Sequence, residues 1–151
     1  MDGKHRWGFA EPGRLRDGVT ALALDGTKTT TASLAIEYEA DGDALPVVGQ
    51  RDILIDSNEQ PVAVVETVSV RVVRLADVDD RHAIDEGEGY ADAAAFRAAH
   101  ERYWRESGAV DRIRAHLGDP AWDLGDDTLV VAERFRIVEH LDANPDPSAG
   151  R

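Results

Sequence analysis

A lysine within a run of threonines is the first place in this chain where side chains could do chemistry. The stretch from Gly26 to Leu34 reads Gly-Thr-Lys-Thr-Thr-Thr-Ala-Ser-Leu, and its Lys28 is one of only two lysines, against fifteen arginines. A glycine that ends a helix, followed by β-branched residues, predicts a strand entry that brings an ammonium group and several hydroxyls together. The alternative is a polar edge strand that happens to carry one lysine.

A carboxylate among valines is the second candidate. Glu66 lies in the valine-rich run from Val62 to Val73, and period two places it on one face with Val64 and Val68. If that face points inward, burial raises the pKa of the carboxyl unless a cation or donor offsets it. We therefore expect Glu66 to line a site. A bulge, a rim position or a pair with a buried arginine is the alternative.

A short acidic segment is the third candidate. His82, Asp85, Glu86 and Glu88 fall within seven residues, and glycines let the backbone turn closely there. Such a segment could supply a general base or hold a hard divalent cation, although acidic runs are more often solvated surfaces. We assign no metal ligand and expect no cofactor. His100, on the apolar side of a helix, is expected to be a hydrogen-bonded core histidine.

The elements that would position these groups follow from periodicity and breaker residues. Helices are expected from Glu11-Pro12 to Gly26, after Asp77 or Asp79, at 92–107 and at 110–117. Strands are expected at 29–38, 52–56, 62–73 and 128–138. This order predicts an α+β fold, a small and mostly antiparallel β-barrel decorated by helices, in which the first and last strands close the sheet.

Composition narrows the classes of function. The 151 residues suit one domain, and the absence of cysteine excludes disulfides, thiolate metal sites and a cysteine nucleophile. The net charge of −13 argues against unselective phosphate binding. Residues 1–34 carry five basic and four acidic groups, against twelve and twenty-six in the remainder, so a polyanion would approach through the N-terminal third. Acidity of this kind also suits general solubility or a salty cytoplasm.

The N-terminus shows no targeting signal. It starts with the polar sequence MDGKHRWGF, and no apolar run approaches the roughly 18 residues that span a bilayer. A cytoplasmic protein without a membrane partner is expected. Trp7 and Phe9 flank a glycine, and this pair would either cover the core or offer a stacking surface for a ring.

Several motifs in the same order resemble the ASCH domain, and more narrowly its longer bacterial subgroup. They are Glu11-Pro12-Gly13-Arg14-Leu15, the Gly26–Leu34 stretch, Pro61 through Val65-Glu66-Thr67, Glu86-Gly87-Glu88-Gly89, and Phe96 through Tyr103. The resemblance covers one domain at residues 7–141, and residues 142–151 are expected to be a disordered tail. It implies a PUA-like β-barrel with helices around a cleft, and a relation to domains that associate with RNA or nucleotides.

The resemblance also implies particular chemistries. Some small members act as amidohydrolases on N4-acetylcytidine, and their catalytic lysine, threonine and glutamate correspond to Lys28, Thr31 and Glu86 here. Other members are metal-dependent ribonucleases of single strands, and many have no assigned activity. Tyr90 stands where the subgroup usually has an acidic residue, which weakens a metal site. Residues 108–124 look like an extension that could cover the cleft or form a dimer contact.

Three functions follow from these patterns and from the resemblance, and we give them in order of preference. The first is binding of a nucleotide, a nucleoside or a short RNA, with no DNA partner expected and a homodimer possible. The predicted ligand-binding residues are Arg14 and Arg16 for phosphates, Trp7 and Tyr90 for stacking, and Glu66 and Glu88 for polar groups. The second is an amidohydrolase in which Glu86 is the base for water or Thr31 and Lys28 stabilises the oxyanion. A metal-dependent ribonuclease is third.

Overall fold

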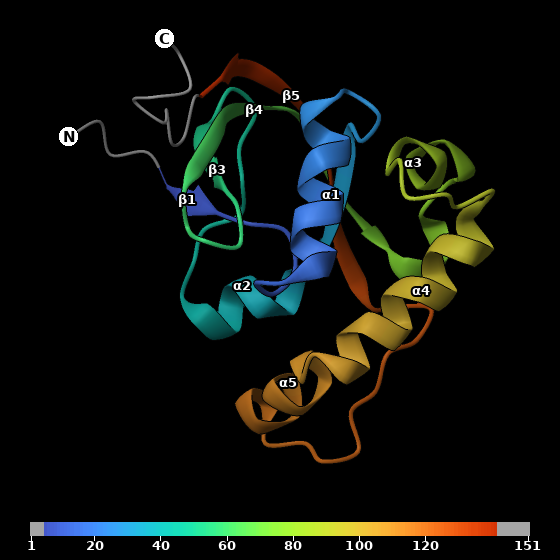
Figure 1. Ribbon diagram of the computed structural model, residues 1–151. Coiled ribbons are helices and arrows are strands. Elements are labelled where there is room, and N and C mark those ends of the chain that lie inside the picture. The colour runs from blue at the N-terminus through green and yellow to red at the C-terminus, as the bar shows by residue number, and fades with distance from the viewer. Residues whose placement is uncertain (1–4, 142–151) are drawn as a thin grey trace, which may run out of the picture.

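The structure is a computed structural model that describes residues 5–141, so the expected tail at 142–151 lies outside the described residues. Its elements, shown in Figure 1, are β1 (Arg6–Trp7), α1 (Arg14–Leu24), β2 (Thr30–Leu34), α2 (Ala35–Asp41), β3 (Arg51–Ile55), β4 (Pro61–Arg74), a 3-10 turn (Leu75–Asp77), α3 (Asp80–Asp85), α4 (Ala93–Glu106), α5 (Ala109–Leu117) and β5 (Leu129–His140).

The described strands form one five-stranded sheet in the order β1-β3-β4-β5-β2. The long strands β4 and β5 pair antiparallel at its centre, and β2 and β3 add antiparallel on either side. The two-residue strand β1 lies parallel to β3 at one edge. The α+β class is confirmed. The first and last predicted strands do pair, as β2 and β5, but the sheet does not close into a barrel, because β1 and β2 remain edge strands that do not pair with each other within residues 5–141.

The strand expected at 29–38 is shorter than its β-branched start suggests. The strand ends at Leu34, and α2 follows from Ala35 to Asp41. Its C-cap is Gly42, which has a left-handed φ of 72°. The segment that follows Leu34 reads Ala-Ile-Glu-Tyr-Glu-Ala. Alanine and glutamate favour a helix, and a glycine at the C-cap stops it, so these local preferences outweigh continuation of the strand.

The inward face of β4 is not the face that carries Glu66. Ala63, Val65 and Thr67 are buried, whereas Val68 is 41% exposed. The register of β4 against β5 shifts between Val64 and Val65 and again between Thr67 and Ser69. Burial alternates without interruption at Ala63, Val65 and Thr67, so Glu66 belongs to the other face: the extra residue of the first shift is on β5, and that of the second, Val68, comes after Glu66. The expectation that Glu66 points inward among valines is therefore wrong.

Two hydrophobic clusters hold the fold together. In the first, α1 packs Val19 and Ala23 against Leu54, Val65 and Phe135 of the sheet. The second joins the helices α3, α4 and α5 to the other end of the sheet; its members are Leu34, Leu75, Val78, Ala83, Phe96, Trp104, Ala109, Val110, Ile113, Leu124 and Val130. Figure 1 shows α1 in front of the sheet, with α3 and α4 forming a separate layer beside it.

The extension at 108–124 is built into this second cluster. Helix α5 packs against α2 and α4, and Arg112 donates a hydrogen bond to the Glu37 carboxylate at 3.1 Å. The segment therefore braces two helices. None of the helices within residues 5–141 is long and apolar enough to cross a membrane.

Candidate functional site

The backbone around Lys28 is fixed between two helix ends. Its N–H donates to the Leu22 carbonyl of α1 at 3.0 Å, and the neighbouring Thr29 N–H donates to the Asp85 carbonyl of α3 at 2.9 Å. The Phe135 N–H of β5 donates to the Thr29 carbonyl at 3.0 Å. The strand entry therefore joins α1, α3 and the sheet, and it carries the Lys28 side chain into the space between them.

The Lys28 ammonium group is buried and fully hydrogen-bonded. The residue is 2% exposed. Its Nζ donates to Glu86 Oε1 at 2.9 Å, to Glu88 Oε2 at 2.9 Å and to the Glu86 carbonyl at 3.2 Å. An ammonium group has three N–H donors, so every donor has an acceptor. The structure thus brings together the Gly26–Leu34 stretch and the Glu86–Glu88 loop.

Glu86 is the centre of this cluster. It follows the last turn of α3, is 1% exposed, and accepts on its Oε2 from His82 Nε2 at 2.7 Å. Burial would raise the pKa of its carboxyl, but the hydrogen bond from His82 and the charge of Lys28 outweigh burial and hold that pKa below its ordinary value. Glu86 is therefore ionised at neutral pH.

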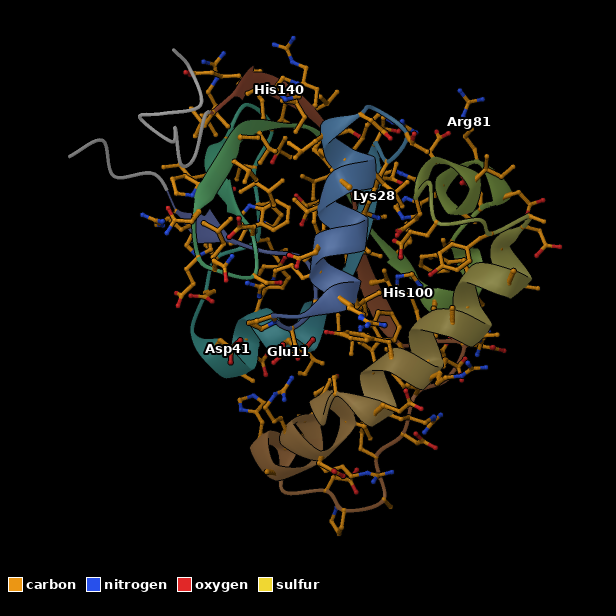
Figure 2. The ribbon with its side chains drawn as sticks, in the orientation of Figure 1. Glu11, Lys28, Asp41, Arg81, His100 and His140 are labelled. Carbon is orange, nitrogen blue, oxygen red and sulfur yellow. The ribbon has the colours of Figure 1, made fainter. Side chains whose placement is uncertain are left out.

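His100 of α4 completes the buried cluster. Its ring stacks on Phe96 at a centroid distance of 4.0 Å, and the Phe96 carbonyl accepts from Nδ1 at 3.0 Å. Its Nε2 lies 3.8 Å from Glu86 Oε1. Burial lowers the pKa of the imidazole, so it is neutral at neutral pH. Figure 2 shows Lys28 and His100 in the region between α1 and the α3–α4 layer.

A pocket of about 280 Å³ opens beside this cluster, and we call it the lysine pocket. Its walls are Phe9, Ala10, Leu15, Val19, Lys28, Thr31, Ala32, Glu86, Glu88, Tyr90, Ala99, His100, Tyr103 and Trp104. Phe9 and Val19 come from one hydrophobic cluster and Trp104 from the other, so the pocket lies where the two clusters meet. Burial, followed by the nearby Glu88 and Glu86 charges, raises the pKa of Tyr90 to about 12. The Tyr90 hydroxyl therefore stays a donor.

A second pocket of about 500 Å³, which we call the edge pocket, adjoins the first. Both are lined by Phe9, Ala10, Thr31 and Ala32. Its other lining residues are His5, Trp7, Gly8, Ser33, Tyr38, Asp43, Ala44, Leu45, Pro46, Gln50, Asp52 and Glu133. Residues from both edge strands, β1 and β2, line it, so it occupies the side on which the sheet fails to close.

The sequence motifs around this site decide the family. The ASCH domain model matches residues 5–139. The chain belongs to the ASCH domain family. This ASCH domain has 26% sequence identity and a TM-score of 0.74 to the crystal structure of an ASCH domain from Lactobacillus crispatus, over 90% of this chain and 80% of that one. The neighbours support the PUA-like class, with the open sheet described above.

A second solved structure has the same fold. It is a protein from Enterococcus faecalis assigned to the family model DUF984, with a TM-score of 0.80 over 100% of this chain and 86% of that one. At 23% identity this likeness concerns the fold. No curated protein matches the ASCH domain described here.

Three residues expected to bind ligand line neither pocket of this ASCH domain. The Glu66 carboxylate accepts from Arg136 at 2.6 Å and lies 3.7 Å from the Arg51 guanidinium. Arg14 is exposed at the start of α1. Arg16 is buried, and its guanidinium donates to the carbonyls of Phe9 and Ala10, at 3.0 Å in each case. Arg16 therefore secures the segment that carries Phe9, and Glu66 belongs to a surface ion pair.

The other expected residues lie in the two pockets. Lys28, Thr31, Glu86, Glu88 and Tyr90 line the lysine pocket. Trp7 lines the edge pocket, where its ring meets the Phe9 ring edge-on at a centroid distance of 4.9 Å. The extension at 108–124 contributes to neither.

Two histidines of the site were not among the predicted catalytic or ligand-binding residues, although His82 was a member of the acidic segment. The four-residue spacing of His82 and Glu86 is a signal for contact on one helix face, and it predicts the hydrogen bond that α3 makes. Asp79 accepts from the His82 N–H and so starts that helix at the required residue. His100 carried no such signal, because a pocket wall and a core position share the same helical periodicity.

The carboxylates of this site are arranged around a cation of the protein itself. Lys28 Nζ lies 2.9 Å from both the Glu86 and the Glu88 carboxylates. Across residues 5–141 no group of three or more His, Asp or Glu side chains is placed to hold a metal ion.

Proposed function

We propose that this ASCH domain binds a nucleoside-like ligand in the lysine pocket. The observation that carries the proposal is a buried lysine–carboxylate cluster in a pocket of about 280 Å³ with aromatic walls. A volume of that size suits one small ligand rather than a polymer. The family's general association with RNA supports a nucleoside-like ligand.

The charge around the two pockets favours a ligand without phosphate. Their walls carry five carboxylates, from Asp43, Asp52, Glu86, Glu88 and Glu133, and no arginine. The one lysine already donates to three acceptors. A phosphate would meet uncompensated negative potential there, and the whole chain adds a net charge of −13. A nucleoside is therefore favoured over a nucleotide or RNA.

The walls of the lysine pocket match the chemistry of a nucleobase. Tyr90, Tyr103 and Trp104 offer aromatic surface for a flat ring. The Glu88 carboxylate is 20% exposed and can accept from an exocyclic amine, and the Tyr90 hydroxyl can donate to a ring carbonyl or nitrogen. Each contact uses a group that already faces the pocket.

An amidohydrolase is the second candidate, because Lys28, Thr31 and Glu86 line the same pocket. Water, or the Thr31 hydroxyl followed by water, would add to the acyl carbon while Glu86 accepts the proton. The carbon–nitrogen bond would then break, the proton would pass to the leaving nitrogen, and acetate and the free amine would be released.

Lys28 would stabilise the oxyanion of that reaction only after giving up one of its present acceptors. Glu88 is the acceptor best placed to leave. Its side chain is 20% exposed, whereas that of Glu86 is 1% exposed. It also lies between Gly87 and Gly89, both with positive φ. We do not propose a metal-dependent ribonuclease, because the Lys28 ammonium lies between the Glu86 and Glu88 carboxylates, where a divalent cation would have to bind.

Calorimetric titration with cytidine, N4-acetylcytidine and cytidine monophosphate tests the binding. We expect both nucleosides to bind, the monophosphate to bind about tenfold more weakly or worse, and Lys28→Ala to abolish binding. Glu66→Gln is the matched control, since Glu66 lies outside the site, and it should bind as the wild type does. No heat from either nucleoside at about millimolar concentration would refute the proposal.

Chromatography of the same mixtures tests for turnover. Release of acetate from N4-acetylcytidine by the wild type, lost in Thr31→Ala and Glu86→Gln, would establish the amidohydrolase. Binding that survives Glu86→Gln, with no acetate released by the wild type, would establish a binding module.

A further inference from the structure

The edge pocket is lined by three acidic side chains, Asp43, Asp52 and Glu133, and the last two come from strands of the sheet. Asp52 comes from β3 and Glu133 from β5, and both line the same cavity of about 500 Å³. Neither a lysine nor an arginine is among its lining residues. The cavity is therefore a concave, acidic space beside the lysine pocket, and Thr31 is shared by the two.

Asp52 is buried with one oxygen left over. The residue is 6% exposed, and its Oδ2 accepts from Gln50 Nε2 at 2.8 Å. Its Oδ1 accepts no hydrogen bond from any residue in the range 5–141. Within residues 5–141 only the Thr20 hydroxyl is a fully buried side-chain polar atom without a partner, so Asp52 Oδ1 keeps access to the pocket and can accept a hydrogen bond from a ligand there.

Glu133 is the second carboxylate of the pocket. Among residues 5–141 its carboxylate makes no hydrogen bond and no ion pair, although it lines the pocket. Burial, and after it the charge of Asp52, raises the pKa of Glu133 to about 7. The charge of Asp52 thus acts on Glu133 with no lysine or arginine lining the pocket to offset it, and a bound cation would supply that positive charge.

The remaining walls suit an organic cation. Trp7 and Tyr38 line the pocket, and an aromatic face attracts an ammonium or guanidinium group. The Tyr38 hydroxyl and the Ser33 hydroxyl lie 3.0 Å apart, and both oxygens remain available as acceptors. The cavity therefore combines carboxylates, aromatic surface and hydroxyl acceptors, which is the environment that binds alkyl amines and guanidines.

We propose that the edge pocket binds a small organic cation, an amine or a guanidine, whose charge is held by Asp52 and Glu133 while Trp7 packs against its apolar part. The proposal does not rest on a nucleoside in the lysine pocket. The charged side chains of the two pockets differ. In the lysine pocket the carboxylates surround Lys28, whereas in the edge pocket Asp52 and Glu133 have no lysine beside them.

Calorimetric titration with agmatine tests it, because agmatine carries both an amine and a guanidinium group. We expect the wild type to bind, and Asp52→Asn and Glu133→Gln each to weaken binding by about tenfold or more. Glu139→Gln is the matched control. Glu139 is exposed on the same strand as Glu133 and lines neither pocket, and its substitution removes the same charge, so it should leave affinity unchanged.

A second control separates the two pockets. Glu88→Gln removes a carboxylate of the lysine pocket and should leave agmatine binding intact. Circular dichroism of each variant checks that the fold is retained. No heat with the wild type at about millimolar agmatine would overturn the proposal. Equal losses in Glu133→Gln and Glu139→Gln would also overturn it, since they would show attraction to net charge alone.

Discussion

The imidazole of His82 and the carboxylate of Glu86 are held 2.7 Å apart, one turn apart on α3, and both side chains are almost completely buried. This hydrogen bond occupies one oxygen of Glu86, and Lys28 occupies the other. The end of α3 therefore positions the Glu86 carboxylate, and His82 and Lys28 fix its orientation. The geometry of the lysine pocket depends on this arrangement.

Removing that imidazole should destabilise the fold. We expect His82→Ala to lower the free energy of unfolding by about 2–3 kcal/mol, because a buried carboxylate oxygen loses its partner and a cavity is left. Urea unfolding followed by circular dichroism measures this. His116→Ala is the control, since His116 pairs with Glu39 at 2.9 Å on the surface. Equal losses in the two variants would contradict the role given to burial.

Gly87 is required by the close approach of the Glu86–Glu88 loop to Lys28. Its φ is 72°, and an added Cβ would lie 2.7 Å from the Thr27 carbonyl oxygen and 2.8 Å from Lys28 Cα. Gly89 has a φ of 95° but no atom within 4 Å of such a Cβ. We expect Gly87→Ala to cost about 2 kcal/mol more than Gly89→Ala in urea unfolding. Similar costs would mean that the loop can move away from Lys28.

Glu133 should make stability depend on pH in an unusual direction. Its pKa is about 7 in the folded protein, against an ordinary value of 4.5. The folded state thus binds this proton more tightly than the unfolded state, so its contribution is complete below about pH 4.5 and is lost as pH rises through about 7. We expect Glu133→Gln to have a free energy of unfolding about 1–3 kcal/mol higher than that of the wild type at pH 8.

The same measurement at lower pH provides the check. The gain from Glu133→Gln should shrink on acidification from pH 8 and disappear below about pH 4.5, where the wild-type carboxyl is protonated in both states. Glu139→Gln should show no such trend. A gain that is constant across this range would mean that Glu133 titrates normally.

Arg16 is expected to act on structure and not on phosphate. Its guanidinium donates to the carbonyls of Phe9 and Ala10, which line both pockets. We expect Arg16→Ala to lower the free energy of unfolding by about 2 kcal/mol, because buried carbonyls lose charged donors. Arg14→Ala, at an exposed position of the same helix, should change little. If Arg16→Ala kept the wild-type stability and lost affinity only for phosphorylated ligands, this result would support phosphate binding by Arg16 instead.

Short-range patterns selected the segments that meet at Lys28, namely the helix stop at Gly26 with the strand after it and the glycine-spaced acids. The family resemblance, and not these patterns, grouped Lys28 with Glu86, which its ammonium contacts at 2.9 Å. The inward placement predicted for Glu66 is wrong because the buried alternation of β4 is Ala63, Val65 and Thr67, and Glu66 lies on the other face. A run with valines in both alternating sets does not show which set faces the core.

The histidines and arginines show a different limit of sequence reasoning. His100 and Phe96 follow one helical stripe, and that stripe describes a core and a pocket wall equally well. Arg16 reads as a surface cation of an amphipathic helix. Its burial becomes visible only when the segment before α1 folds back across it, a tertiary contact that no local pattern encodes.

The bulges of β4 have a consequence for how this domain could change its ligand. Bulges bend a strand and increase its twist, so they help to set how far the sheet curls. Strands β1 and β2 are its two borders, and both flank the edge pocket. The curl of the central strands thus helps to set the width of that pocket, although no residue of β4 lines it. A change in one of these bulges would alter the shape of the cavity without substituting any residue that lines it.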